Sequence, residues 1–432
     1  MTPTHPLFLE NCRIIDPASG IDRIGSLLII DGLCRVAAAQ DALPPETERL
    51  DLTGHWVMPG LIDMHVHLRE PGEEYKETIA SGTLAAANGG FTAVACMPNT
   101  KPVLDSESGI SLVVNRARHA AARVYPVGAI SKESHGERLA DFGEMKRAGA
   151  VAFTDDGRPV SNSQMMRRAM EYAANFDLPI ISHSEEMSLS WNGAMNEGAV
   201  ATRLGLPGIP RAAEEIMVYR DLALATLTGH RLHLAHISTR ESVSLIRRAK
   251  AAGCRVTAET APHYFTLTEE AIGLYDTAAK MNPPLRSQDD VRAIIEGLQD
   301  GTIDAIASDH APHSELEKEV EFDQAANGII GLETSFPLSL RLVHDGLLEV
   351  GRLVELMSVN PARILGVAGG TLADGAVADV TVIDPERCFT YSREAVVSKS
   401  RNSPFLDWQF TGQAVMTIVG GRIVLRKGGE AD

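Results

Sequence analysis

Positive charge is in deficit in this chain of 432 residues, where 40 Lys and Arg stand against 57 Asp and Glu for a net charge of −17. Such a balance argues against nucleic acid or an anionic membrane surface as the main partner, although a local pair of arginines can still bind a small anion. No apolar run approaches the ~18 residues that a membrane span needs. We therefore expect no nucleic-acid partner and no membrane partner.

Cysteine is also scarce, and its spacing is uninformative for metal binding. The five cysteines are scattered and form no CxxC pair, namely Cys12, Cys34, Cys96, Cys254 and Cys388. This pattern excludes a disulfide framework and a cysteine zinc site, and it is typical of a reducing compartment. Residues 1–10 show no basic segment followed by an apolar stretch, as a secretory signal would. The sequence therefore predicts a cytoplasmic protein.

Short strands with turn residues between them occupy both ends of the chain. Hydrophobic residues make up 44% and charged residues 22%, as in an ordinary globular protein rather than a disordered chain or a coiled coil. The strand-like runs at the two ends are Leu7–Ile15, Gly25–Asp31, Leu33–Ala39, Val377–Ile383, Phe410–Gly412 and Ala414–Leu425, with Gly420-Gly421 as a hairpin turn. We expect residues 1–56 and 369–432 to form one small β-sandwich domain.

The middle of the chain alternates between β-rich and helical patterns. Eight apolar runs are typical of buried parallel strands: Val57–Leu68, Thr92–Met97, Val124–Ser131, Ala150–Thr154, Pro179–His183, Arg231–Ile237, Arg255–Thr260 and Ile303–Ser308. Helical spacing is clearest at Glu77–Asn88, Ser108–Ala121, Ser163–Asn175, Ala212–Thr228, Ser242–Ala252 and Asp289–Gln299. This order predicts a (β/α)₈ TIM barrel over residues 57–368. A doubly wound sheet is the alternative, but no G-x-G-x-x-G turn follows the first strand.

Histidines and aspartates stand where the predicted barrel strands end, and the mouth of a barrel is where active sites are built. His65 and His67 are two residues apart, so both point to one face of their strand. His183, His236 and Asp309 end three further strands. Imidazole nitrogens held by stiff strands are preorganised metal ligands. The five residues together predict a metal centre at the mouth.

The same residues could hold two cations, with a carboxylate between them. His65, His67 and Asp309 would serve one cation, and His183 and His236 the other. Asp155 and Asp156 both end the fourth strand, and alternation directs only one of them into the mouth. His263, near the end of the seventh strand, is more typical of a structural histidine.

Four further polar residues lie near the ligands in sequence. Arg69 follows the first strand, and a guanidinium group pairs with a carboxylate through two parallel hydrogen bonds, although many arginines form only surface ion pairs. Its place next to His67 favours contact with an anionic substrate. Asn99 and His313 follow the ends of other strands, while Asn282 could equally be turn chemistry before a proline.

Two motifs of the chain resemble those of the dihydroorotases in the amidohydrolase superfamily. These are Asp63-Met64-His65-Val66-His67-Leu68-Arg69-Glu70-Pro71-Gly72 and Ala307-Ser308-Asp309-His310-Ala311-Pro312-His313, with Lys318 following. The long bacterial class I branch is similar also at Gly89–Thr92, Met97–Thr100 and Met281–Arg286, and the superfamily's return to its β domain resembles Gly370–Val380. The likeness covers nearly the whole chain.

The resemblance implies a zinc-dependent cyclic amide hydrolase that interconverts N-carbamoyl-L-aspartate and (S)-dihydroorotate in pyrimidine (UMP) biosynthesis, with one or two Zn²⁺ ions per subunit. By position, the metal ligands would be His65, His67, Asp156, His183, His236 and Asp309. Asp309 would also be the catalytic acid–base group, and contacts with the substrate would come from His67, Arg69, Asn99, Asn282, Asp309, His313, Asn327 and Gly328. Many relatives bridge the metals with a carboxylated lysine on strand four, but residues 149–154 contain no lysine.

The resemblance also implies a homo-oligomer, with aspartate transcarbamoylase as a candidate partner. It leaves three other readings. An allantoinase or hydantoinase would share the fold and the metals, but those relatives favour the strand-four lysine. A non-catalytic partner of aspartate transcarbamoylase is opposed by the retention of all six ligands. A plain metal-storage protein would have no use for Arg69 beside the ligands.

Overall fold

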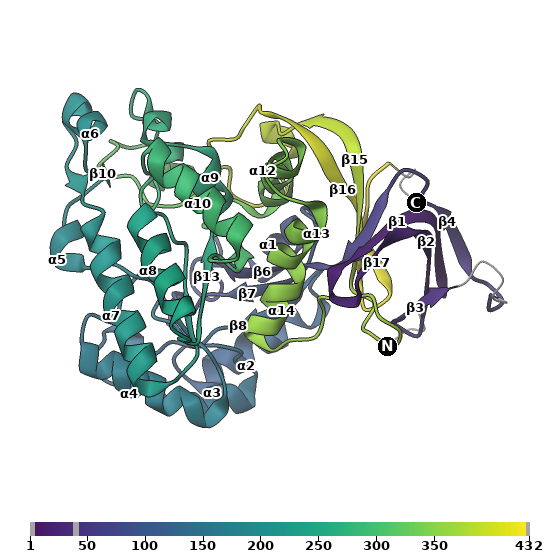
Figure 1. Ribbon diagram of the computed structural model, residues 1–432, viewed down its shortest axis with the longest axis horizontal. Coiled ribbons are helices and arrows are strands. Elements are labelled where there is room, and N and C mark those ends of the chain that lie inside the picture. Colours follow the sequence, from purple (N-terminus) through teal and green to yellow (C-terminus); the bar gives the residue numbers. More distant parts are fainter. Residues whose placement is uncertain (1–4, 38–42, 429–432) are drawn as a thin grey trace.

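The computed structural model describes residues 5–37 and 43–428, so the last two residues of the predicted strand Leu33–Ala39 lie outside the described residues. Figure 1 shows two parts side by side: a barrel made from the middle of the chain, and a β structure to which both ends of the chain contribute. The molecule is thus a TIM barrel with a β-sandwich from the termini, as the sequence predicts.

The terminal β structure joins strands that are far apart in the sequence. Its order is β17-β16-β15-β5-β1-β2-β3, and β4 pairs with β1. The central seam is the antiparallel pairing of β5 with β15, where Val57 lies opposite Val382. The strands are β1 (Leu7–Asp16), β2 (Ile21–Ile30), β3 (Leu33–Ala37), β4 (Glu48–Asp51), β5 (Trp56–Pro59), β15 (Val380–Thr390), β16 (Gln409–Val419) and β17 (Arg422–Arg426). One apolar cluster draws on both ends, for example Leu9, Ile29, Val380 and Ile418, and stabilises the pairing.

The predicted single strand Val57–Leu68 is wrong, because the chain divides it between the two parts. Strand β5 belongs to the terminal sheet, and β6 (Leu61–Val66) begins the barrel. Gly60 stands between them, where an added Cβ would lie only 2.1 Å from Thr92 Oγ1. Only glycine allows this close approach of two strands. The predicted domain boundary between residues 56 and 57 falls inside β5.

Eight positions around the barrel are linked by parallel pairing. Seven are strands: β6, β7 (Phe91–Cys96), β8 (Arg123–Pro126), β9 (Ile180–Ser182), β12 (Leu232–Leu234), β13 (Val256–Thr260) and β14 (Ala305–Ile306). The fourth predicted strand, Ala150–Thr154, is reduced to bridges from Phe153 to Gly128 and to Ile180. A parallel bridge between Val66 and His310 closes the ring.

Helices follow the strands close to where the spacing predicts them. The predicted six are α1 (Ile79–Asn88), α2 (Glu107–Arg116), α4 (Ser163–Ala173), α7 (Ala212–Thr228), α8 (Arg240–Ala251) and α10 (Gln288–Asp300). Side-chain caps fix several of their starts; Thr78, Asn162 and Thr239, for example, each accept a hydrogen bond from a backbone N–H of the first turn. Two later helices, α12 (Leu332–His344) and α14 (Asn360–Leu365), complete the barrel part. Within the described ranges, no helix is long and apolar enough to cross a membrane.

A buried carboxylate ties the two ends of the barrel sheet together. Asp63 on β6 is fully buried and accepts hydrogen bonds from the backbone N–H of His65 and of Ser308. Burial raises the pKa of its carboxyl to about 6, against the effect of these hydrogen bonds. The contact holds the first and the last barrel strands in register directly below the predicted metal ligands.

Candidate metal centre and active site

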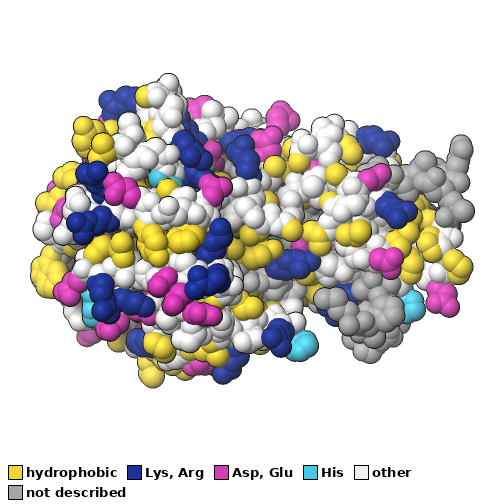
Figure 2. Space-filling view, turned by 90° about the horizontal axis from the view of Figure 1, so that it is seen from below, with side chains coloured by type: hydrophobic (Ala, Val, Ile, Leu, Met, Phe, Trp, Pro, Cys, Tyr) yellow, Lys and Arg dark blue, Asp and Glu magenta, His cyan; other side chains and the backbone are white. Residues whose placement is uncertain are grey.

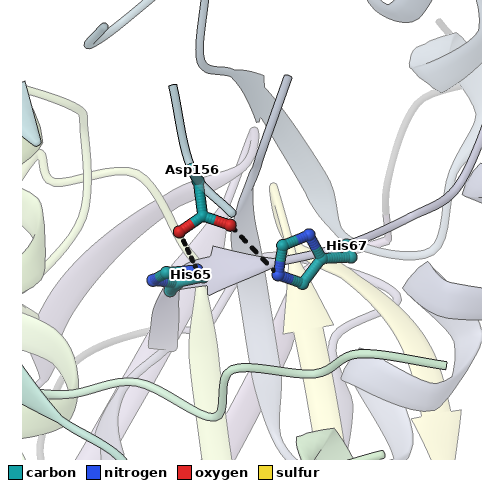
Figure 3. A group of neighbouring side chains, drawn as sticks. All are labelled: His65, His67 and Asp156. Carbon is teal, nitrogen blue, oxygen red and sulfur yellow. Dashed lines mark ion pairs between the residues drawn. The ribbon is translucent and has the colours of Figure 1, made fainter. Parts of the chain in front are cut away.

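The six predicted metal ligands converge at the mouth of the barrel. His65 lies on β6 and His67 directly follows it, and the others follow the fourth, fifth, sixth and eighth strand positions. The carboxylate of Asp156 lies at the centre, with one oxygen toward His65 and the other toward His67 (Figure 3). Its oxygens lie 3.4 Å from His65 Nε2, 3.6 Å from His67 Nε2, 3.6 Å from His183 Nδ1 and 3.7 Å from His236 Nε2.

Asp156 belongs to two groups of side chains that could each hold a cation. One group is His65, His67 and Asp156, and the other is Asp156, His183 and His236; all are buried. Asp309 approaches the first group, with its Oδ1 3.3 Å from His67 Nε2 and 3.6 Å from His65 Nε2. A carboxylate shared by two groups has the arrangement of a ligand that bridges two metals.

The protonation pattern of the histidines fits a metal. His65 Nδ1 lies 2.7 Å from Glu259 Oε1, His67 Nδ1 lies 2.9 Å from Asn99 Oδ1, and His183 Nε2 lies 3.1 Å from Glu185 Oε2. These oxygens accept a hydrogen bond, so in the neutral ring that a metal requires the opposite nitrogen carries a lone pair toward the centre. His65 Nε2 and Asp156 Oδ1 are buried without a hydrogen-bond partner. The donor set is thus that of a metal site whose ligands are already oriented.

Without a metal, the carboxylate of Asp156 and the histidines around it stabilise each other's charged forms. Burial by itself would raise the pKa of Asp156, but the facing histidines hold it well below its ordinary value. Burial would likewise lower the pKa of His183, yet Asp156 and Glu185 raise it to about 10. A cation would take over the role of these protons, because metal binding requires deprotonated ligands.

Sequence reasoning missed the carboxylates that orient the histidines. Glu259 on β13 is fully buried and also lies 3.2 Å from His233 Nε2 through its second oxygen. It lies 194 residues from His65, and nothing in the local sequence links the two. Glu185, two residues after His183, could have been found by strand alternation.

Asp155 is directed away from the cluster. Its Oδ1 accepts a hydrogen bond from the backbone N–H of Ser131 at 3.0 Å, and its Oδ2 accepts one from the Ser131 hydroxyl. Burial raises the pKa of its carboxyl to about 6. Of the two adjacent aspartates, only Asp156 therefore faces the histidines.

A cavity of about 210 Å³ opens beside the ligand cluster. Every predicted metal ligand except His65 lines this cavity. The remaining predicted substrate contacts also line it: Arg69, Asn99, Asn282, His313, Asn327 and Gly328. Arg69 is 7% exposed, and its Nε donates a hydrogen bond to the carbonyl of Pro312. Among the described residues, no carboxylate lies within 4.0 Å of its guanidinium group. A buried guanidinium without a counter-ion is prepared for an anionic ligand.

The other cavity residues are held by the protein itself. The Asn99 Oδ1 faces His67, so its Nδ2 is the group left for a ligand. Asn282 Nδ2 donates to Glu185 Oε2 at 2.9 Å. His313 Nε2 donates to the carbonyl of Asn327 at 2.8 Å, and burial together with Arg69 lowers the pKa of His313 to about 3. The same Nε2 lies 3.3 Å from Arg69 Nη2, so the neutral ring stands directly beside the guanidinium group.

The far end of the chain also takes part in the wall of the cavity. Asn402 accepts a hydrogen bond from the backbone N–H of His313 and donates to the carbonyls of Ala311 and Gly328. Lys318 Nζ donates to the carbonyls of Ala326 and Gly328. No motif in the sequence indicates Asn402 as part of the site.

Three residues of the site have a left-handed backbone conformation. Arg69, His236 and Asp309 have φ values of 60°, 36° and 49°, in the left-handed region that side-chain-bearing residues rarely adopt. Such conformations persist where the surrounding structure enforces them, and they cluster at functional sites.

His263 is buried nearby, and burial lowers its pKa to about 4.

Comparisons with known proteins agree with this geometry. The family described as Dihydro-orotase-like matches residues 54–242. A protein of Desulfotalea psychrophila named Dihydroorotase is 59% identical over 415 residues, which cover 96% of this chain and 98% of the relative. One of Geobacter metallireducens with the same name is 54% identical over 422 residues, covering 98% of this chain and 100% of the relative.

Solved structures show the same fold. An L-hydantoinase (dihydropyrimidinase) from Arthrobacter aurescens superposes with a TM-score of 0.87 at 26% identity and covers 99% of this chain and 98% of that chain. A dihydropyrimidinase from Brevibacillus agri superposes with a TM-score of 0.84 at 21% identity, over 98% of this chain and 95% of that chain, and shows the fold alone.

Proposed function

The chain belongs to the dihydroorotase family, and from this premise we propose that it interconverts N-carbamoyl-L-aspartate and (S)-dihydroorotate at the cavity beside Asp156. The reaction opens or closes a cyclic amide and belongs to pyrimidine biosynthesis. Dihydroorotate carries one carboxylate on a small polar ring, so its site needs a cation-binding group and a means of activating water.

The observation that carries this proposal is the unpaired guanidinium of Arg69. It is buried in the same cavity as Asp156 and Asp309 and has no carboxylate partner within 4.0 Å among the described residues. The substrate carboxylate supplies the missing charge through two parallel hydrogen bonds. Asn99 Nδ2 donates a further hydrogen bond from the other side of the metal ligands. The ring is then held by Asn282, Asn327 and Gly328.

The residues around Asp156 would hold one or two Zn²⁺ ions, with His65, His67 and Asp309 on one side and His183 and His236 on the other. A bound Zn²⁺ ion lowers the pKa of a coordinated water toward neutrality and polarises a carbonyl oxygen. Asp156 would take the bridging place that a carboxylated lysine has in many relatives. The orienting contacts from Glu259, Glu185 and Asn99 keep the ring nitrogens of the histidines turned toward Asp156, where they would hold the ions.

Asp309 acts as the acid–base group of the reaction. Its Oδ1 is 3.3 Å from His67 Nε2, so the carboxylate borders both the ligands and the cavity. During hydrolysis it accepts a proton from the attacking water and delivers it to the departing ring nitrogen. In the reverse direction it removes a proton from the carbamoyl nitrogen as that nitrogen attacks the carboxyl carbon, and it returns the proton to the oxygen that leaves as water. Such a proton shuttle contributes ~10²–10⁴ in rate.

Several finer features are part of the same proposal. The metal is zinc, the enzyme is a homo-oligomer, and aspartate transcarbamoylase is a possible partner. The five cysteines are all free, which supports a cytoplasmic location. Residues 1–56 and 369–432, together with the rest of β5, form one domain, and the barrel that begins with β6 forms the other.

A direct assay tests the proposal. The purified chain is loaded with Zn²⁺, and the conversion of dihydroorotate is followed beside that of hydantoin and allantoin. We expect turnover of dihydroorotate in both directions and little turnover of the other two rings. Activity on hydantoin alone would assign the chain to the neighbouring hydantoinases, and inactivity of the fully loaded chain on all three would reject catalysis.

A further inference from the structure

A second cavity lies at the opposite end of the barrel from Asp156. Its volume is about 480 Å³, and none of its lining residues lines the first cavity. Pro179, Arg231 and Arg255 each stand just before a barrel strand, respectively β9, β12 and β13. The cavity is therefore at the N-terminal ends of the strands whose other ends carry His183, His236 and Glu259.

Three arginines line this cavity: Arg231, Arg255 and Arg363. Their guanidinium groups are held mostly by neutral oxygens. Arg231 donates to the carbonyls of Asp177 and Ile364, at 3.1 and 2.6 Å. Arg363 Nη2 donates to Asn360 Oδ1 at 3.1 Å, and Arg255 Nη1 donates to the carbonyl of Gly229 at 3.5 Å.

These contacts fix the guanidinium groups without neutralising them. The only carboxylate within 4.0 Å of the three, among the described residues, is that of Asp177, which is 80% exposed and lies 3.5 Å from Arg231 Nη1. An exposed pair of this kind is weak. On the face shown in Figure 2, basic and acidic side chains are interspersed. The cavity therefore carries positive charge, although the whole chain has a net charge of −17.

The remaining lining gives the cavity an apolar wall made of Leu232, Val256 and Ile364. A cavity of several hundred Å³ is of the size that takes an organic molecule rather than a bare ion. Guanidinium groups are the preferred partners of phosphate, since their N–H groups match pairs of phosphate oxygens. The wall would accommodate the organic part of such a ligand.

From this arrangement we propose that the cavity binds a small organic phosphate, with its phosphate group on Arg231, Arg255 and Arg363 and its body against Leu232, Val256 and Ile364. The site is separate from the catalytic cavity and does not depend on the metal. Arg255 and Arg363 are exposed, so a ligand can enter from solvent.

Calorimetric titration of the Zn²⁺-loaded enzyme with UMP, uridine and inorganic phosphate tests this site. We expect saturable UMP binding, weaker binding of inorganic phosphate that competes with UMP, and no binding of uridine. The double variant Arg255→Gln/Arg363→Gln should bind UMP at least ~10-fold more weakly, because it loses two charge-assisted contacts. Arg240→Gln/Arg422→Gln is the matched control, since it removes two exposed arginines that do not line the cavity.

A third variant separates the two cavities. Arg69→Met removes the cation of the catalytic cavity and should leave UMP affinity unchanged, whereas a loss there would move the phosphate to the catalytic site and overturn the proposal. Absence of UMP binding to the parent enzyme, or equal affinity in the Arg255→Gln/Arg363→Gln variant, would overturn it as well. Inorganic phosphate that binds as tightly as UMP would reject the role of the apolar wall.

Discussion

The two ends of the barrel use charge in opposite ways. At the C-terminal ends of the strands, buried histidines lie 3.3–3.7 Å from the buried carboxylates of Asp156 and Asp309. At the N-terminal ends, arginines are held by carbonyl and amide oxygens, and two of the three are exposed. The first end brings opposite charges together for metal binding, and the second leaves positive charge largely uncompensated. One set of strands therefore supports two kinds of site, because the residues beside each strand end decide the chemistry.

A line of buried contacts runs part of the way between the ends. Thr257 Oγ1 lies 2.8 Å from His233 Nδ1, His233 Nε2 lies 3.2 Å from Glu259 Oε2, and Glu259 Oε1 lies 2.7 Å from His65 Nδ1. Each step moves one residue farther from the metal ligands. If only the end near Asp156 supports the metal, a substitution should lower zinc affinity less the farther along this line it lies from His65.

The largest effect is expected from Asp156→Ala, which removes the carboxylate shared by both ligand groups. Zinc affinity should fall by more than the ~10–100-fold that the loss of an outer-shell partner causes, and activity should fall with it. Zinc content measured after dialysis checks this. Asp155→Ala is the matched control and should retain more metal, although it loses the contact with Ser131.

The same bridge makes a second measurable distinction. Because a genetically encoded carboxylate needs no carbon dioxide to form, reconstitution with Zn²⁺ should proceed equally with and without bicarbonate. A requirement for bicarbonate would indicate that a lysine from elsewhere in the chain forms the bridge, and it would contradict the assignment of Asp156.

Asp309→Asn should follow in size. The substitution keeps the shape of the side chain but removes its proton acceptor, so kcat should fall by at least ~10² while the fold is retained. Steady-state kinetics and circular dichroism of the variant check both parts. Turnover close to that of the parent enzyme would remove Asp309 from the mechanism.

Arg69→Met should weaken substrate use without changing the metal content. The variant loses a buried charge pair with the substrate carboxylate. The activation free energy that corresponds to kcat/KM should therefore rise by ~2–5 kcal/mol. Arg69→Lys keeps the charge but not the paired geometry and should recover part of the loss. If kcat/KM is unchanged in Arg69→Met, the substrate carboxylate binds elsewhere in the cavity.

Glu259→Gln should have a smaller effect on the metal centre. The amide can still accept a hydrogen bond from His65 Nδ1, but the charge that makes the histidine a stronger ligand is lost. Zinc affinity or activity should fall ~10–100-fold. A competition titration against a chelator measures this, and an affinity equal to that of the parent enzyme would show that Glu259 is structural only.

Thr257→Val should have the smallest effect, since Thr257 is three contacts removed from His65. The loss of one hydrogen bond should lower the free energy of unfolding by ~1 kcal/mol, with zinc affinity close to that of the parent enzyme. Denaturant unfolding and the same chelator titration check the two quantities. A fall in zinc affinity as large as that of Glu259→Gln would show that the line of contacts transmits its effect without decline.

The sequence predicted the barrel because strand and helix patterns alternate with the right periods, and it predicted the positions of the ligands because barrel strands end at one face. The division of Val57–Leu68 at Gly60 was not predicted, since both halves are apolar and only the close approach to Thr92 separates them. Glu259 and Asn402 were not predicted either, because their partners lie 194 and 89 residues away and no local pattern records such contacts.

The contacts of Asn402 have a consequence for the order in which the molecule is made. The metal ligands from His65 to Asp309 can emerge from the ribosome in sequence, but the wall formed by Ala311, His313 and Gly328 waits for a residue near the end of the chain. Ser398 reaches back in the same way to Glu77, beside the first helix of the barrel. A nascent chain therefore cannot hold a finished cavity, and catalysis begins only after nearly the whole polypeptide has been synthesised.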